Sequence, residues 1–193
     1  MNVDVSNLQG YTDALRKNGK VVFLNWVTLN KTGAYVFRSS QPYYTGNDDT
    51  IQDFDDDAIS LLKEYNIKLI ISLNAYGVTE EGMLKLTAAG ITHINKPVKD
   101  FGTPTLADLY ICCQLLHETI TNGDKALIYC GFGAGRTGTL WSAFQIYRLP
   151  RNKNLKTEVS RIVKDSTAET KGHEVIMLEF ANELKVTDTK IEL

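Results

Sequence analysis

The sequence predicts an α/β fold, with a mainly parallel central sheet flanked by helices, from two observations. Short apolar runs typical of strands alternate along the chain with longer amphipathic segments typical of helices, an order that favours a parallel sheet. One of these runs, IKLIISLN (67–74), is almost continuously apolar, as strands buried on both faces are. In such sheets ligands bind beyond the carboxyl ends of the strands, so we expect a functional site at those ends.

Five apolar runs, bounded by residues that favour turns, are predicted to form strands. The first two are joined through NKTG (30–33), and the last ends at Cys130. In chain order the predicted strands cover residues 21–26, 34–39, 67–74, 91–98 and 125–130. Cys130 therefore lies at the carboxyl end of a predicted strand.

Six segments are predicted to form helices, and several carry signals at their ends. Gly90 suits the C-cap of the second helix. Pro104 and Gly123 bracket the third, and Pro150 stops the fourth. The acidic run NDDTIQDFDDD (47–57) is predicted to be a solvated loop and the start of the first helix, whose positive end favours aspartates. The predicted helices cover about residues 55–65, 79–90, 105–122, 136–149, 154–166 and 173–185.

The size and charge of the chain limit its class. Its 193 residues, 43% of them hydrophobic, are enough for one well-buried core, so we expect a single domain over 1–193 with its core at about 20–185. The net charge of −2 and the pI near 5.9 lack the basic excess of nucleic-acid-binding proteins, so no nucleic-acid partner is expected. An anionic ligand therefore needs a local site. The sequence does not indicate an oligomeric state.

The compartment is predicted from what the sequence lacks. No run approaches the length of about eighteen apolar residues typical of a membrane-spanning helix. The N-terminal MNVDVSNLQG has neither the basic nor the apolar region of a cleaved signal peptide. The three cysteines are odd in number and two of them, Cys112 and Cys113, are adjacent, which argues against a disulfide framework. A cytoplasmic protein is expected, and export without a cleaved signal would leave the same pattern.

The segment LIYCGFGAGRTGT (127–139) joins a predicted strand to a predicted helix through a glycine-rich loop. Glycines let the backbone curl so that successive N–H groups point inward and hold an anion. The helix that follows adds its N-terminal N–H groups and the positive end of its dipole. The predicted phosphate loop consists of Gly131, Phe132, Gly133, Ala134, Gly135 and Arg136.

Cys130 and Arg136 give this loop its chemistry. The fork of Arg136 can bind two oxygens of a phosphate, and the positive field favours the thiolate form of Cys130. A thiolate beneath a phosphate is placed for in-line attack, and Thr137 can hydrogen-bond the sulfur as it departs. A structural cysteine beside a flexible turn is the alternative, but it does not explain an arginine at a helix start, where its charge opposes the dipole. The pattern therefore predicts a nucleophile.

The order Cys, five residues, Arg and then Thr resembles the signature of the Cys-based protein tyrosine phosphatase superfamily. The segment CGFGAGRTG matches that signature at Cys130, Gly133, Arg136, Thr137 and Gly138. Within the superfamily the chain is most similar to the small dual-specificity-like phosphatases, which implies a protein tyrosine phosphatase-like fold. A P-loop NTPase is excluded, because no Gly-Lys-Ser/Thr is present.

Two further segments extend the resemblance. FRSSQP (37–42) is similar to a segment of many small dual-specificity-like phosphatases that is chiefly structural, so Arg38 is expected to support the loop rather than to bind substrate. The family places a general-acid aspartate about thirty residues before the cysteine, which implies that role for Asp100 in PVKDFGTPT (97–105). Asp108 is the next candidate, but its position suits the first turn of a helix.

The resemblance implies a cysteine-dependent phosphatase that hydrolyses phosphomonoesters through a phosphocysteine, with no metal or other cofactor. The expected substrate is a phosphorylated protein, at phosphotyrosine or with dual specificity, or a small phosphomonoester. An inositol phosphate or a phosphoinositide is the alternative: the uncharged loop interior favours the first class, whereas Lys96 and Lys99 favour the second. Tyr129, where the family usually has a histidine that orients the loop, leaves open a catalytically weak phosphate-binding protein.

For each of two groups of side chains near the predicted site, the sequence leaves two interpretations open. Tyr43 and Tyr44 follow the FRSSQP segment, and they either line the rim of the pocket or pack in an ordinary loop. An acidic rim either repels polyanions or only solvates the surface, and its members are Asp48, Asp49, Asp53 and Asp55. No metal-ligand spacing is found among the scattered histidines, which are His93, His117 and His173.

Overall fold

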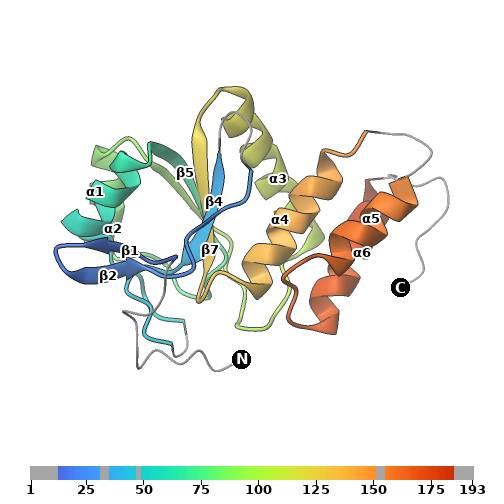
Figure 1. Ribbon diagram of the computed structural model, residues 1–193, viewed down its shortest axis with the longest axis horizontal. Helices are drawn as coiled ribbons and strands as arrows, with labels where there is room; N and C mark the ends of the chain where they lie inside the picture. Colours follow the sequence, from blue (N-terminus) through green and yellow to red (C-terminus); the bar gives the residue numbers. More distant parts are fainter. Residues whose placement is uncertain (1–12, 31–34, 47–48, 151–154, 185–193) are drawn as a thin grey trace.

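A computed structural model describes residues 13–30, 35–46, 49–150 and 155–184 (Figure 1). Their centre is a five-stranded sheet in the order β3-β4-β7-β5-β6, in which β3 runs antiparallel to β4 and the other neighbours run parallel. In sheet order the strands are Val27–Thr28 (β3), Val36–Ser40 (β4), Lys125–Cys130 (β7), Ile67–Ser72 (β5) and Thr92–Asn95 (β6). The predicted mainly parallel central sheet is confirmed.

Helices cover both faces of this sheet, as Figure 1 shows. Helices α1 and α2 pack on one face, α3 and α4 pack on the other, and α5 and α6 pack against α4. Their bounds are Asp56–Glu64 (α1), Glu80–Ala88 (α2), Leu106–Thr121 (α3), Gly135–Tyr147 (α4), Leu155–Lys164 (α5) and Lys171–Glu183 (α6). The six predicted helices are confirmed, with ends that differ from the predicted ones by no more than two residues.

Side-chain caps explain where several of these helices begin. The carboxylate of Asp55 accepts a hydrogen bond from the Ala58 N–H at 3.0 Å and so caps α1, as the acidic run predicted. Threonine hydroxyls accept equivalent bonds at the starts of α2, α3 and α6. Helix α4 differs, because Ala134 at its N-cap has no side-chain hydrogen bond to the helix. The first N–H groups of α4 therefore lack a side-chain cap, which suits an anion site.

The two faces of β7 contribute to different hydrophobic cores. Ala126, Ile128 and Cys130 belong to the core beneath α3 and α4. Leu127 and Tyr129 belong to the core beneath α1 and α2. This separation follows from the alternation of side chains along a strand. Cys130 and its neighbour Tyr129 therefore point to opposite faces of the sheet.

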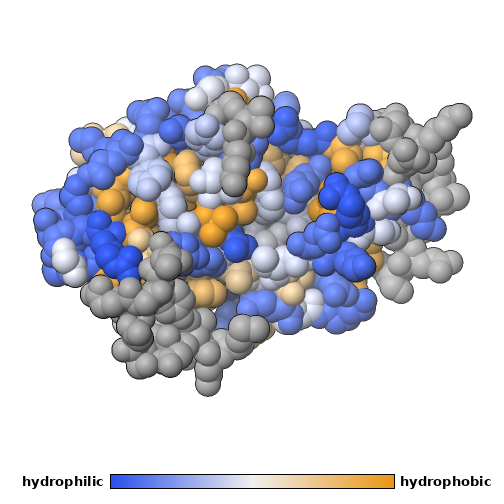
Figure 2. Space-filling model, viewed as in Figure 1, coloured by the Kyte–Doolittle hydropathy of each residue, from blue (hydrophilic) through white to orange (hydrophobic). Residues whose placement is uncertain are grey.

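The surface is mixed in polarity. On the face seen in Figure 2, hydrophobic residues show in several separate patches, and hydrophilic residues cover much of the helices at both sides. Within the described ranges, no helix combines the length and the apolar character that crossing a membrane requires.

The start of the chain differs from the prediction of one strand over 21–26. Residues Lys20–Phe23 (β2) pair with Leu15–Lys17 (β1) in a separate two-stranded sheet, and the chain joins the central sheet only at β3. The break falls at Asn25, whose φ of 50° lies in the left-handed region that asparagine tolerates better than most residues. The prediction of a single strand is therefore wrong, because Asn25 interrupts the apolar run. Residues 31–33 of the expected connection lie outside the described residues.

Candidate active site

Cys130 lies at the carboxyl end of β7, the middle strand of the sheet, where a pocket of about 520 Å³ opens. The side chain is only 3% exposed, and the Gly133 N–H points to its Sγ at 3.3 Å. The loop of residues 131–135 then turns directly into α4. The predicted order of strand, loop and helix is thus confirmed, and it places the sulfur at the floor of the pocket.

Two glycines make this loop geometrically possible. Gly133 has a φ of 89°, which side chains rarely adopt, and a Cβ there would collide with the backbone of Ser39. A Cβ on Gly131 would collide with the carboxylate of Asp49. The loop is therefore wrapped closely by β4 on one side and by the segment that carries Asp49 on the other.

Hydrogen bonds from two distant segments orient the peptide groups of the loop. The Gln41 N–H donates to the Gly131 carbonyl at 2.8 Å. The Asn25 amide donates to the carbonyls of Phe132 at 3.3 Å and Gly133 at 3.1 Å. Since the peptide bonds of the described residues are trans, each N–H that follows one of these carbonyls points the opposite way, into the pocket. This arrangement turns three successive N–H groups, of residues 132–134, toward the space above the sulfur.

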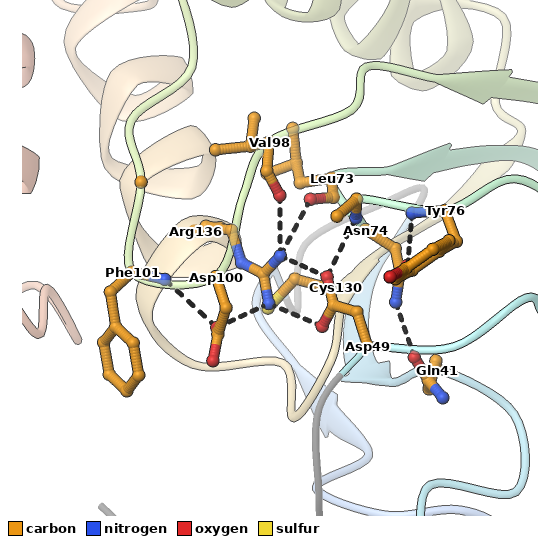
Figure 3. A network of polar contacts seen from close by, with 12 residues as sticks. Gln41, Asp49, Leu73, Asn74, Tyr76, Val98, Asp100, Phe101, Cys130 and Arg136 are labelled. Atoms are coloured by element: carbon orange, nitrogen blue, oxygen red, sulfur yellow. Dashed lines mark hydrogen bonds and ion pairs between the residues drawn. The ribbon is translucent and has the colours of Figure 1, made fainter.

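Arg136 is buried at the side of the pocket, with 3% of its side chain exposed, and its fork is fully engaged (Figure 3). Its Nη1 donates to Asp49 Oδ2 at 2.5 Å, to the Val98 carbonyl at 2.8 Å and to the Leu73 carbonyl at 3.4 Å. Its Nη2 donates to Asp49 Oδ1 and Asp100 Oδ1 at 2.8 and 2.9 Å. Burial lowers the pKa of Arg136, but the hydrogen bonds that it donates to Asp49 and the Coulombic effects of Cys130, Asp49 and Asp100 outweigh burial and hold the pKa above its ordinary value.

Asp49 is the functional candidate that the sequence prediction missed. Its carboxylate forms the bidentate pair with Arg136, also accepts from the Ala75 N–H at 2.8 Å, and is only 5% exposed. The prediction of a solvated acidic loop is therefore wrong at this residue, because a buried carboxylate requires a partner and the partner lies 87 positions away. A lone aspartate within an acidic run carries no sequence signal of such a contact.

The other members of the predicted acidic rim do not act together. Asp53 is an exposed residue that accepts from the Thr79 hydroxyl at 3.2 Å. Asp55 caps α1 and accepts from the Tyr43 hydroxyl at 2.6 Å. Asp48 lies outside the described residues. Within the described chain the rim is thus divided between a buried ion pair at Asp49 and the start of a helix.

Asp100 stands on the loop between β6 and α3 and reaches the same pocket. Its carboxylate is half exposed and accepts from Arg136 Nη2 at 2.9 Å and from the Phe101 N–H at 3.1 Å. Asp108 instead lies in the first turn of α3, as expected, and forms an ion pair with Lys96 at 2.8 Å. Neither Asp108 nor Lys96 lines the pocket, so Asp100 is the better placed of the two candidate acids.

Thr137 and Arg38 lie behind the loop. Thr137 is fully buried, and its hydroxyl has no hydrogen-bond partner within the described part of the chain. The guanidinium of Arg38 donates to the Thr167 hydroxyl at 3.2 Å, and this hydroxyl donates to the Ala134 carbonyl at 2.9 Å. Arg38 does not line the pocket, which suits the supporting position that the resemblance implied.

Tyr129 is buried on the opposite face of β7. Its hydroxyl donates to Gln52 Oε1 at 2.9 Å and lies 3.3 Å from His93 Nε2. Burial raises the pKa of Tyr129 and lowers the pKa of His93 to about 4. Tyr129 therefore takes part in a closed polar cluster, and its side chain does not reach the pocket where Cys130 lies.

Aromatic side chains form part of the pocket wall. Tyr44, Phe101 and Phe132 line it, and the rings of Tyr44 and Phe132 are 6.1 Å apart. Burial raises the pKa of Tyr44 to about 12, so its hydroxyl is neutral near pH 7. Tyr43 instead turns toward Asp55 and does not line the pocket. Of the two interpretations, the rim is thus correct for Tyr44 and loop packing is correct for Tyr43.

A second segment that the sequence prediction missed closes the pocket beside α4. Glu169 lines the pocket, and its carboxylate lies against Gly135. The Glu169 N–H donates to Nδ1 of the fully buried His173 at 3.2 Å, and His173 Nε2 lies 2.8 Å from the Gly102 carbonyl. Since Nδ1 accepts, Nε2 carries the proton and donates. His173 thereby joins the Asp100 loop to the segment that carries Glu169.

Metal binding has no candidate cluster in the part of the chain that the structure describes. Within it, no group of three or more His, Cys, Asp or Glu side chains could hold a metal ion. Cys112 and Cys113 are buried in the core, where burial raises the pKa of the Cys112 thiol to about 12.

The fold and the phosphate cradle, by which we mean Cys130 and the loop of residues 131–136, together define a protein of the Cys-based protein tyrosine phosphatase superfamily. Residues 47–149 match the family described as "polymorphic toxin system, DSP-PTPase phosphatase". This match spans more than half of the chain, and the chain belongs to that family. The predicted superfamily is thereby confirmed.

Relatives and solved structures agree with this assignment. The tyrosine-protein phosphatase cdcA of Emericella nidulans is 40% identical over 63 residues, which are 32% of this chain and 11% of that protein. The match thus spans about a tenth of the relative's length. A variant of Tk-PTP has a similar fold, with a TM-score of 0.59 and 19% identity over 84% of this chain and 97% of that one. PTPMT1, solved with PI(5)P, gives a TM-score of 0.59 and 17% identity over 82% of this chain and 96% of that one.

Proposed function

We propose that this chain is a single-domain, cysteine-dependent phosphatase that hydrolyses phosphomonoesters through a phosphocysteine. The observation that carries the proposal is the convergence of three groups on one pocket. Cys130 lies at its floor beneath the loop N–H groups, Arg136 lies at its side, and Asp100 lies at its mouth. These are the nucleophile, the anion clamp and the proton donor that a phosphoryl transfer requires.

In the first step, the Cys130 thiolate attacks phosphorus in line with the leaving oxygen. An S–P bond forms and the P–O bond to the leaving group breaks, while the departing oxygen takes a proton from the carboxyl group of Asp100. The N–H groups of residues 132–134 and the guanidinium of Arg136 hold the three remaining oxygens. Their charge is already in place, so little reorganisation is needed as negative charge develops.

In the second step, a water molecule replaces the leaving group. The Asp100 carboxylate takes a proton from this water, whose oxygen attacks phosphorus, and the P–S bond breaks to release inorganic phosphate. The departing sulfur again becomes a thiolate. The buried Thr137 hydroxyl has no hydrogen-bond partner within the described residues, so it is free to take the predicted role of donating to this thiolate.

Arg136 and Asp100 have to exchange partners during this cycle. In the structure Nη2 of Arg136 bonds both Asp49 and Asp100. A phosphate that takes the donor used by Asp100 frees this carboxylate, which can then carry a proton to the leaving group. Asp49 keeps its bidentate contact and holds the plane of the guanidinium. Asp49 is therefore proposed as a positioning residue for Arg136.

The proposed substrate is a phosphorylated protein, at phosphotyrosine or with dual specificity. Tyr44, Phe101 and Phe132 line the pocket, and this supports a substrate with an aromatic leaving group, because aromatic rings pack favourably against one another. An inositol phosphate or a phosphoinositide is the alternative, and PTPMT1 has been solved with PI(5)P, but at 17% identity that likeness concerns the fold alone. Neither of the two lysines that favoured polyanions, Lys96 and Lys99, lines the pocket, and Lys96 pairs with Asp108.

Hydrolysis of p-nitrophenyl phosphate, a generic aryl phosphate, tests the proposed activity. We expect turnover that Cys130→Ser abolishes and that Cys112→Ser, a change in the core of α3, leaves in place. Phosphopeptides and inositol phosphates, assayed side by side, then test the substrate class. Selective turnover of the inositol series would exclude the phosphoprotein assignment, and binding of phosphate without turnover would favour the catalytically weak alternative.

A further inference from the structure

We infer that Glu169 determines specificity at this pocket, by favouring phosphotyrosine that stands beside basic side chains and by disfavouring substrates with a second anionic group. The inference rests on the proposed phosphatase function. It concerns the mouth of the pocket rather than the cradle, and a residue that the superfamily signature does not contain.

The charges that line the pocket are mostly negative. Among its described lining residues Arg136 is the one cation, whereas Asp49, Asp100 and Glu169 carry carboxylates. Asp49 and Asp100 both form ion pairs with Arg136, so two negative charges already neutralise the single positive charge. A phosphate adds further negative charge. The Coulomb field at the mouth then favours a cationic neighbour on the substrate and opposes an anionic one.

Glu169 differs from the other two carboxylates in its contacts. Neither a hydrogen bond nor an ion pair engages its side chain within the described residues, although its backbone N–H is hydrogen-bonded. The Glu169 N–H donates to His173, which is fully buried and also contacts the Gly102 carbonyl near Asp100. The charge of Glu169 is thus anchored beside the pocket by its backbone, while its side chain stays available to a substrate.

The aromatic side chains that line the same pocket indicate the rest of the substrate. Tyr44 and Phe132 line the pocket with rings 6.1 Å apart, and Phe101 is 51% exposed on the Asp100 loop. An aromatic ring can pack between these side chains while its phosphate sits in the cradle. The residues that flank a phosphotyrosine in a peptide then pass the rim where Glu169 stands. Lysine or arginine at those flanking positions complements the free carboxylate.

Two phosphotyrosine peptides of equal length test this inference, one with lysines and one with glutamates beside the phosphotyrosine. We expect kcat/KM to be about three- to tenfold higher for the lysine peptide, the effect of one partly solvated charge pair. In Glu169→Gln this preference should approach unity, and in Glu169→Lys it should reverse. Glu118→Gln, an exposed change on α3 outside the pocket, should keep the wild-type preference.

The salt dependence of the wild-type enzyme gives a second measurement that needs no variant. Raising the ionic strength should reduce the preference for the lysine peptide, because salt screens exposed charges. Equal turnover of the two peptides by an enzyme active on p-nitrophenyl phosphate overturns this inference alone. A preference that survives in Glu169→Gln or at high salt overturns it as well. Absence of turnover of the aryl phosphate overturns the proposed function, and this inference with it.

Discussion

The carboxyl end of β7 carries a polar cluster on each of its two faces, and the clusters are built differently. On one face Cys130 lies under N–H groups that point into an open pocket, beside Arg136. On the other face the Tyr129 hydroxyl, Gln52 and His93 contact one another in the core beneath α1 and α2. The first cluster leaves donors available to a ligand, whereas the second uses its donors internally.

This difference shows how one strand can serve reactivity and stability at adjacent positions. Polar groups that satisfy each other in a core hold a structure together but offer little to a substrate. Groups that face a pocket can bind an anion, at some cost to stability while the pocket is empty. We therefore expect changes on the Cys130 face to alter turnover most, and changes on the Tyr129 face to alter the free energy of unfolding.

The largest effect is expected for Arg136→Ala. We expect kcat/KM for p-nitrophenyl phosphate to fall by about 1000-fold or more, because the charge that stabilises the transferring phosphoryl group is lost. The change also leaves Asp49 buried without its partner, which should lower the free energy of unfolding by about 3–5 kcal/mol. Enzyme kinetics and urea unfolding measure the two effects. Arg161→Ala, an exposed change on α5, is the control, and a loss of activity under tenfold in Arg136→Ala would contradict the assigned role.

Asp100→Ala should have the next largest effect, and one that depends on the leaving group. Turnover of an alkyl phosphate should fall by about 100-fold or more, because its oxygen needs a proton to depart. Turnover of p-nitrophenyl phosphate should fall much less. Asp108→Ala removes the carboxylate that pairs with Lys96 outside the pocket and serves as the matched control. Equal slowing of both substrates by Asp100→Ala would show that Asp100 is not the acid.

Asn25→Ala tests the support of the loop from outside the pocket. It removes both donors from the carbonyls of Phe132 and Gly133, which should cost about 1–3 kcal/mol per unsatisfied group and reduce kcat by about tenfold. Asn66→Ala is a close control, because Asn66 also has a positive φ, of 56°, but stands after α1, away from the site. Both changes should lower the melting temperature. Unchanged kcat in Asn25→Ala would mean that the loop keeps its shape without these bonds.

Most of the fold and the cradle could be predicted because their signals are local. The apolar run of β5, the glycine near the end of α2 and the spacing between Cys130 and Arg136 each lie within a few residues. Backbone propensities, end signals and the geometry of a short loop act over that range. Asp100 was predicted on a different basis, since the resemblance supplied its distance from the cysteine, and the structure places it against Arg136.

The walls of the site could not be predicted because they depend on contacts between distant segments. Asp49 meets Arg136 across 87 positions, and Asn25 meets Gly133 across 108. Asp49 stands in an acidic run that has the composition of a solvated loop, and Asn25 interrupts an apolar run that has the composition of one strand. Glu169 follows an ordinary helix end. A single sequence shows the residue type at such positions, but it does not show what the fold brings against them.

The smallest predicted effect lies on the Tyr129 face and depends on pH. Burial lowers the pKa of His93 to about 4 in the folded protein, below the ordinary value of 6.5 that it regains on unfolding. The unfolded chain therefore binds the proton more readily than the folded one between these values. Stability is fully present above pH 6.5 and is lost as the pH falls toward 4, by about 1 kcal/mol between pH 7 and 5.5.

Urea unfolding at these two pH values, compared with His93→Gln, isolates this contribution. The variant should lose about 1 kcal/mol less stability on acidification than the wild type, because glutamine does not titrate. His117→Gln, an exposed change on α3, should leave the wild-type pH dependence in place. Turnover at pH 7 should change little in His93→Gln, since His93 does not line the pocket. A large loss of turnover would instead couple the two faces of β7, and the Tyr129 cluster would then help to position the nucleophile.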